Sequence, residues 1–166
     1  MLLPRIIPCL LIRDKGLVKT VRFDKFKYVG DPINAVRIFN EKCVDELCVL
    51  DIDVYQKNKE PNYKMISHLA MESRMPFCYG GGIKTVEQAI KILSLGVEKI
   101  ALSSSIINDP SLISNIASVA GRQSVVAVFN CKKRRFRNKY DLFIDNGKII
   151  TGLDPIQFAK KIQKFG

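Results

Sequence analysis

The stretch Pro76-Phe77-Cys78-Tyr79-Gly80-Gly81-Gly82-Ile83 decides the fold of this chain. Its first four residues form a short apolar run that predicts a strand, and the three glycines that follow predict a turn. Thr85 can then cap a helix, because the apolar residues after it recur at helical spacing. A strand, a glycine turn and an amphipathic helix in this order predict one βα unit of a parallel sheet.

The same order recurs on both sides of this unit. Further strands are predicted at residues 5–12, 47–52, 99–102 and 124–129, and the strand at 5–12 is expected to be buried on both faces. Helices are predicted at 31–42, 62–74, 112–120 and 155–165, and a hairpin around Asn146-Gly147. The polar, basic segment 13–28 is expected to form a long loop. Five βα repeats predict a parallel sheet with covering helices.

Regular repeats with polar or glycine residues after the strands favour a TIM (β/α)8 barrel over a doubly wound sheet. Eight such units need roughly 200–250 residues, whereas this chain has 166. We therefore expect an α/β fold in one domain, 1–166, that holds units one to five of a partial barrel. Such a barrel would be incomplete or completed by association.

Composition limits the classes of protein to consider. With 47% hydrophobic and 26% charged residues, the chain has the balance of a globular protein and is neither collagen-like nor disordered. The five cysteines lack any CxxC spacing, which favours reduced thiols over disulfides or zinc. We expect a cytoplasmic protein with no signal peptide, membrane span, metal or cofactor. The net charge of +11 suggests nucleic acid, an acidic partner or a phosphorylated substrate.

Two neighbouring strands end in groups suited to an anion. Gly81 and Gly82 follow one strand, and Ser103 and Ser104 follow the next. Backbone N–H groups and hydroxyls in such turns can surround a phosphate. The alternative is a simple tight turn and a cluster of helix-capping serines. Lys19, in the predicted loop, is either an anion clamp or a solvated charge.

Carboxylates at a strand end form the other candidate site. Asp51 ends the predicted strand at 47–52 and Asp53 lies two residues on, on the same face of an extended chain. Together they could carry out acid–base work or orient a sugar hydroxyl, but such carboxylates also cap helices. His68 lies on a predicted helix away from the strand ends, which favours a surface or packing role.

A basic run at residues 132–139 carries six cations in eight positions. Such a run can follow a phosphate backbone. Here it follows a strand and belongs to no recognised nucleic-acid module. Nucleic-acid binding is therefore not expected.

Five motifs stand out when the chain is read as a whole: Arg5-Ile6-Ile7-Pro8-Cys9-Leu10, Gly30-Asp31-Pro32, Leu50-Asp51-Ile52, Gly80-Gly81-Gly82-Ile83 and Asn108-Asp109-Pro110-Ser111-Leu112-Ile113. Together they resemble the HisF family, the cyclase subunit of imidazole glycerol phosphate synthase. The resemblance implies a (β/α)8 barrel that receives ammonia from a glutaminase subunit and cyclises a phosphoribulosyl precursor in histidine biosynthesis. That reaction yields imidazole glycerol phosphate and AICAR, and the family is classed as a lyase. The resemblance also implies that this chain stops before the sixth strand.

The resemblance also assigns roles to single positions. Leu11 and Asn130 stand where the family has its two acid–base aspartates, and neither side chain can exchange a proton near neutrality. Asp51 remains a possible auxiliary group, and the glycine and serine pairs named above match the family's first phosphate site. Cyclase activity is therefore uncertain.

The family's ammonia gate is matched in part. Arg5, Glu46 and Lys99 stand at three of its charged positions, and Glu98 lies beside them on the face that docks the glutaminase. This combination resembles the HisF-like paralogues of surface-polysaccharide (O-antigen, lipopolysaccharide) clusters. That likeness implies a heterodimer with a HisH-like glutaminase that channels ammonia to an amidotransferase acting on a nucleotide sugar. The alternatives are an active cyclase and a non-functional truncated gene product.

Overall fold

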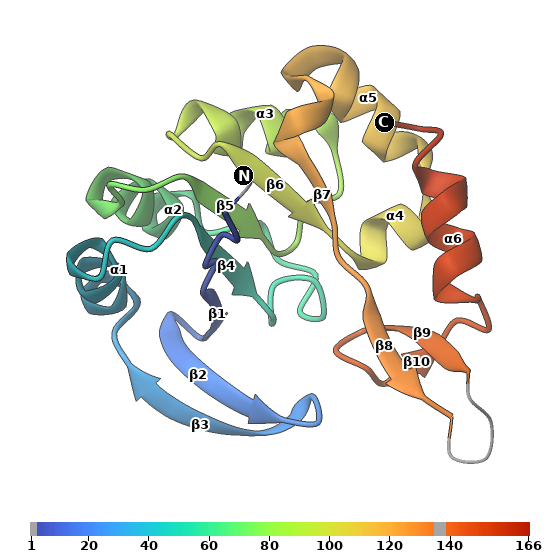
Figure 1. The fold of residues 1–166 in the computed structure, drawn as a ribbon, viewed down its shortest axis with the longest axis horizontal. Coiled ribbons are helices and arrows are strands. Elements are labelled where there is room, and N and C mark those ends of the chain that lie inside the picture. Colours follow the sequence, from blue (N-terminus) through green and yellow to red (C-terminus); the bar gives the residue numbers. More distant parts are fainter. Residues whose placement is uncertain (1–2, 135–138) are drawn as a thin grey trace.

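The computed structural model describes residues 3–134 and 139–166. It holds a seven-stranded sheet in the order β3-β2-β1-β4-β5-β6-β7 and a three-stranded sheet in the order β10-β9-β8 (Figure 1). The strands of the large sheet are β1 (Cys9–Arg13), β2 (Gly16–Val21), β3 (Asp24–Gly30), β4 (Leu47–Asp51), β5 (Phe77–Gly80), β6 (Lys99–Leu102) and β7 (Val125–Ala127). Those of the small sheet are β8 (Asn130–Lys133), β9 (Tyr140–Ile144) and β10 (Ile149–Ile150).

Five of the helices begin within one residue of their predicted starts. Asp31 caps α1 by accepting a hydrogen bond from the Asn34 N–H. Thr85 and Gln88 form a capping box at the start of α3, and Asp154 caps α6. The helices are α1 (Pro32–Glu41), α2 (Tyr63–Glu72), α3 (Val86–Ser94), α4 (Ser104–Asn108), α5 (Ser111–Ala120) and α6 (Pro155–Ile162), with a 3-10 turn η1 (Arg122–Ser124).

The five predicted βα units are present in the large sheet. Strands β1, β4, β5, β6 and β7 pair in parallel, which confirms the α/β fold with a parallel sheet. In the described part of the chain the sheet is open, with β3 and β7 at its edges, so a closed barrel is not seen. None of the described helices has the length and apolar content that crossing a bilayer requires.

Two expectations were wrong, and the basic run is placed only in part. The first strand begins at Cys9 instead of residue 5, and residues 3–7 are exposed, because Pro4 and Pro8 have no N–H to donate to a sheet. The expected loop at 13–28 is the antiparallel hairpin β2–β3, entered through the left-handed residues Asp14 and Lys15. The basic run begins as β8, which pairs with β9, while its residues 135–138 lie outside the described ranges.

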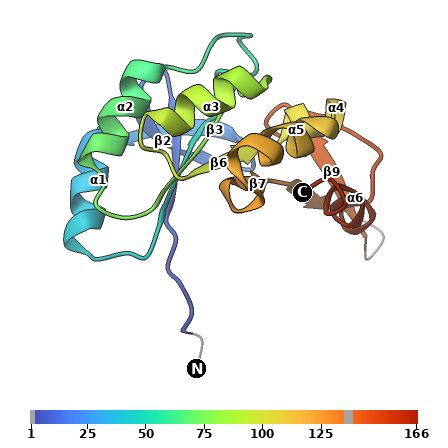
Figure 2. The ribbon, with the colours of Figure 1, turned by 90° about the horizontal axis from the view of Figure 1, so that it is seen from above.

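The two faces of the large sheet differ. Helices α1, α2, α3 and α5 cover one face (Figure 2). Leu47 and Val49 of β4 are fully buried in the core, whereas Cys48 and Leu50, which alternate with them, are half-buried and belong to the opposite face. We call this opposite side the inner face. Its side chains line the surface between the two ends of the parallel strands.

Candidate functional site

A cavity of about 100 Å³ lies at the carboxyl ends of β4, β5 and β6. All four glycine and serine residues of the predicted phosphate site line it, so the fold brings both halves of that prediction together. Parallel strands place such turns at one edge of a sheet, where ligands of α/β proteins commonly bind. The lining residues are Leu50, Asp51, Ile52, Tyr55, Gly80, Gly81, Gly82, Ile83, Ala101, Leu102, Ser103, Ser104, Ser105, Val128 and Asn146.

The glycine turn is shaped by close approach as well as by backbone conformation. Gly81 has a φ of +138°, and a Cβ there would lie 2.6 Å from the Asp51 carbonyl oxygen. Gly82 has a φ of +69°, and its Cβ would lie 2.2 Å from Cγ1 of Val54. Only glycine combines a positive φ with the absence of a Cβ that would clash. These short distances show that the turn packs directly on the end of β4 and the segment that follows it.

Ser103 provides an unused polar group at this cavity. Its hydroxyl is buried and has no hydrogen-bond partner, and the residue lies between β6 and α4. A buried hydroxyl without a partner is unfavourable by about 1–3 kcal/mol. An acceptor oxygen of a ligand in the cavity would provide the missing partner. Lys19 is placed elsewhere: it is an exposed residue of β2, opposite Lys27 of β3, and does not line the cavity.

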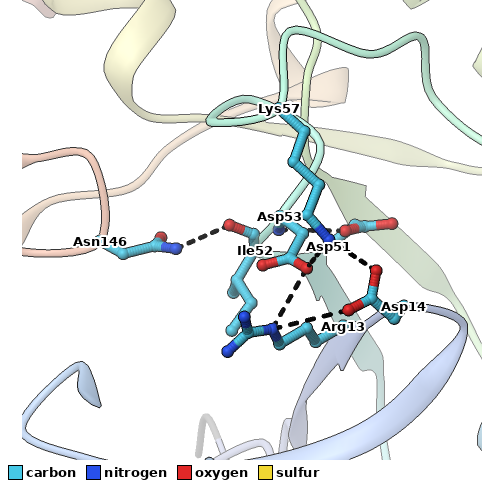
Figure 3. A network of polar contacts seen from close by, with 7 residues as sticks. All are labelled: Arg13, Asp14, Asp51, Ile52, Asp53, Lys57 and Asn146. Carbon is cyan, nitrogen blue, oxygen red and sulfur yellow. Dashed lines mark hydrogen bonds and ion pairs between the residues drawn. The ribbon is translucent and has the colours of Figure 1, made fainter.

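Asp51 is a buried carboxylate in the cavity wall. Burial raises its pKa to about 6, although the backbone N–H of Asp53 donates to it at 3.2 Å. Asp53 has a different environment, because its Oδ2 lies 3.2 Å from Nε of Arg13 and 2.6 Å from Nζ of Lys57 (Figure 3). The two carboxylates therefore do not act as a matched pair. Asp51 can titrate near neutrality, whereas Asp53 holds an ion-pair network together.

That network fixes the segment after β4. Lys57 also reaches Oδ1 of Asp14 at 2.6 Å, which ties the β1–β2 turn to this segment. The pairing lowers the pKa of Asp14 below its ordinary value. From the other side, the Asn146 amide donates to the Ile52 carbonyl at 2.7 Å (Figure 3). The turn between β9 and β10 thus closes one wall of the cavity.

Sequence reasoning missed two residues of this wall. Asn146 was expected only to form a turn, and Tyr55 was not considered. The Tyr55 hydroxyl accepts a hydrogen bond from the Asn108 amide at 2.8 Å, which ties the segment after β4 to the end of α4. The Asn-Gly pair at 146–147 signals a hairpin, but no local signal shows that the hairpin folds back onto β4.

The three predicted gate residues meet at the opposite ends of the strands. Glu46, just before β4, is buried and accepts a hydrogen bond from Nζ of Lys99 at 2.6 Å. Arg5 is mostly exposed, with its NH1 atom 3.9 Å from the same carboxylate. Glu98 is exposed beside Lys99. His68 is exposed on α2, as expected for a surface residue.

The two positions where the resemblance places acid–base aspartates lie apart in the structure. Leu11 is half-buried on β1, directly opposite Leu50 of the cavity wall. Asn130 begins β8 opposite Phe143 and does not line the cavity. Within residues 3–134 and 139–166, no three His, Cys, Asp or Glu side chains form a group that could hold a metal ion.

Comparisons with known proteins identify the family of the chain. The family model described as histidine biosynthesis protein matches residues 5–166. The chain is a HisF-like member of that family. It is 55% identical over all 166 residues to a protein of Vibrio vulnificus strain YJ016, provisionally named imidazole glycerol phosphate synthase subunit hisF3. A Leptospira interrogans protein, provisionally named subunit HisF of the same synthase, is 52% identical.

A third relative is named as a HisF subunit without the provisional qualifier of the first two. The imidazole glycerol phosphate synthase subunit HisF of Lactococcus lactis subsp. lactis strain IL1403 is 36% identical over the whole chain. This HisF-like chain spans 64% of the Vibrio and Lactococcus proteins and 65% of the Leptospira protein.

Proposed function

We propose that this HisF-like chain belongs to a subunit that pairs with a HisH-type glutaminase and passes ammonia to an acceptor reaction elsewhere, without cyclising a precursor itself. The cavity holds a phosphorylated ligand in this proposal. The acceptor is an amidotransferase that acts on a nucleotide sugar.

The observation that carries the proposal is the placement of two polar sites at opposite ends of one strand. Lys99 begins β6 and pairs with Glu46, and Ser103 follows the end of β6 in the cavity wall. Ser103 lies four positions after Lys99, which corresponds to about 13 Å at 3.3 Å per residue. Ammonia that enters beside the ion pair would travel along the inner face to reach the cavity.

The inner face between these sites is apolar. Leu50 lies opposite Leu11 and Gly80, and the row continues through Ala101 and Val126. Neutral ammonia crosses such a surface far more easily than ammonium, because an unpaired charge is strongly disfavoured there. The same row puts a leucine where the family resemblance calls for a proton-exchanging aspartate. Passage of ammonia would survive that replacement, whereas acid–base catalysis of cyclisation would not.

The test is reconstitution of the full chain with a HisH-type glutaminase. We expect a 1:1 complex by analytical ultracentrifugation. We also expect ammonia released from amide-labelled glutamine to reach an acceptor before it mixes with ammonia in the medium. Lys99→Met should weaken this transfer by more than about tenfold without dissociating the complex. Failure to form any complex, or full exchange with unlabelled ammonia, would contradict the proposal.

A second candidate, cyclisation in histidine biosynthesis, is favoured by one observation. Asp51 lies in the cavity wall with a pKa of about 6, which suits a general acid or base near neutrality. This candidate needs Asp51 to replace both aspartates of the resemblance. It predicts turnover of the phosphoribulosyl precursor with ammonium salts, and loss of that turnover in Asp51→Ala.

A further inference from the structure

Three of the five cysteines form a row across neighbouring strands on the inner face. Cys48 of β4 lies directly opposite Cys9 of β1 on one side and Cys78 of β5 on the other. Residues paired in this way point to the same face of a sheet, and neighbouring strands are about 4.8 Å apart. We call Cys9, Cys48 and Cys78 the thiol row. Neither Cys43 nor Cys131 belongs to it, and both are exposed.

The members of the row differ in exposure and influence one another. Cys9 is exposed, Cys48 is half-buried and Cys78 is buried, so access to solvent falls along the row. Cys48 raises the pKa of the Cys9 thiol, and Cys78 contributes to raising the pKa of Cys48 to about 12. The thiols are therefore close enough to interact. The raised pKa of Cys9 means that this thiol must lose its proton before its sulfur can attack an oxidant.

The spacing of the row suits disulfide formation between neighbours. Cysteines joined by a disulfide have Cα atoms 4.4–6.8 Å apart in general, and directly paired residues of parallel strands fall at the short end of this range. A disulfide between Cys9 and Cys78 would have to span two strand spacings, which is too far. Cys48 is therefore the shared member of any disulfide within the row.

We propose that the thiol row is an oxidative modification site at which a hydroperoxide converts Cys48 and one neighbour into a disulfide. The exposed sulfur of Cys9, after losing its proton, attacks one peroxide oxygen. The O–O bond breaks, which gives a sulfenic acid and one water. The Cys48 sulfur then displaces the hydroxyl group as a second water and forms the S–S bond. Two thiols lose two electrons and two protons, and hydrogen peroxide is reduced to two waters.

Cys78 extends the chemistry of the row. Its sulfur can attack Cys48 in the Cys9–Cys48 disulfide, which releases Cys9 as a thiol and moves the bond to the buried pair. Exchange of this kind needs three sulfurs nearly in line, and three strands in register supply that arrangement. Cys78 also lies opposite Lys99, so the moved disulfide lies beside the Lys99–Glu46 ion pair.

The inference stands apart from the proposed function, because it needs neither a glutaminase nor a substrate. The test treats the full chain with hydrogen peroxide and maps disulfides by mass spectrometry under non-reducing conditions. We expect a loss of two hydrogens from the intact chain and Cys48 in every disulfide within the chain. Replacing Cys9 should slow the reaction by about tenfold or more, because the exposed thiol that reacts first is lost.

Matched variants decide the result. Cys48→Ser and Cys48→Ala should both abolish the disulfide while retaining the circular dichroism spectrum, and Cys43→Ser should react like the unchanged chain. Two results would overturn the proposal. One is a disulfide pattern in which Cys43 or Cys131 replaces Cys48. The other is oxidation of Cys9 to sulfinic acid with no disulfide.

Discussion

Gly82→Ala tests how tightly the glycine turn packs on the segment after β4. The change has two energetic parts. An alanine at a φ of +69° is unfavourable by about 1–2 kcal/mol. Its Cβ would also meet Cγ1 of buried Val54 at 2.2 Å, and overpacking of this kind adds about 1–3 kcal/mol. The expected loss in free energy of unfolding is about 2–5 kcal/mol.

Gly152→Ala is the matched control, because it separates the two parts. Gly152 has a φ of +74°, nearly that of Gly82, but a Cβ there would meet nothing within 4 Å. Both substitutions also reduce the freedom of the unfolded chain equally, so this effect cancels in the comparison. The difference between the two variants therefore measures the clash alone.

The assay is equilibrium unfolding in urea, followed by circular dichroism. A difference of about 2 kcal/mol corresponds to a midpoint about 1 M lower for Gly82→Ala than for Gly152→Ala, given slopes of about 1–3 kcal/mol per M. Equal midpoints for the two variants would refute the packing of the turn against Val54. The wall of the cavity would then be wrongly described.

Three further predictions concern the polar groups of the site. Lys99→Met leaves the buried Glu46 carboxylate with only the distant Arg5, and should lower the free energy of unfolding by about 1–3 kcal/mol. A double-mutant cycle with Glu46→Gln should show coupling between the two residues, and additive effects would contradict the ion pair. Asp51 has a folded-state pKa of about 6, above 3.8, so the unchanged chain should lose stability as pH rises from about 4 to 6. Asp51→Asn should remove this loss and gain about 1–3 kcal/mol at pH 7; a parallel pH dependence in both proteins would exclude a raised pKa. Asn146→Ala removes the hydrogen bond to the carbonyl of Ile52 and should lower the free energy of unfolding by about 1 kcal/mol. Amide hydrogen exchange in the β9–β10 turn should become faster, and an unchanged exchange rate would contradict that contact.

Features that depend on interactions within a few residues could be predicted from the sequence. The caps Asp31 and Thr85 start their helices, and the apolar run before the glycine turn is a strand, because side chain and backbone act within a few residues. The hairpin β2–β3 was missed since its turns place Asp14 and Arg22 in left-handed conformations that glycine usually adopts.

The candidate site was predictable to the same extent. The glycine and serine turns could be expected to meet, because adjacent parallel strands end at one edge of the sheet. By contrast, the contact of Asn146 with Ile52 joins residues far apart in the chain, and no local pattern signals it. The alignment of Cys9 with Cys48 also depends on strand register, which only the paired sheet defines.

The central claim is that the subunit passes ammonia on and does not cyclise a precursor. It is tested most directly by incubating the full chain with the phosphoribulosyl precursor and ammonium salts and measuring imidazole glycerol phosphate. The account predicts no turnover above the uncatalysed rate, because Leu11 and Asn130 cannot exchange protons. Robust turnover that disappears in Asp51→Ala would contradict it.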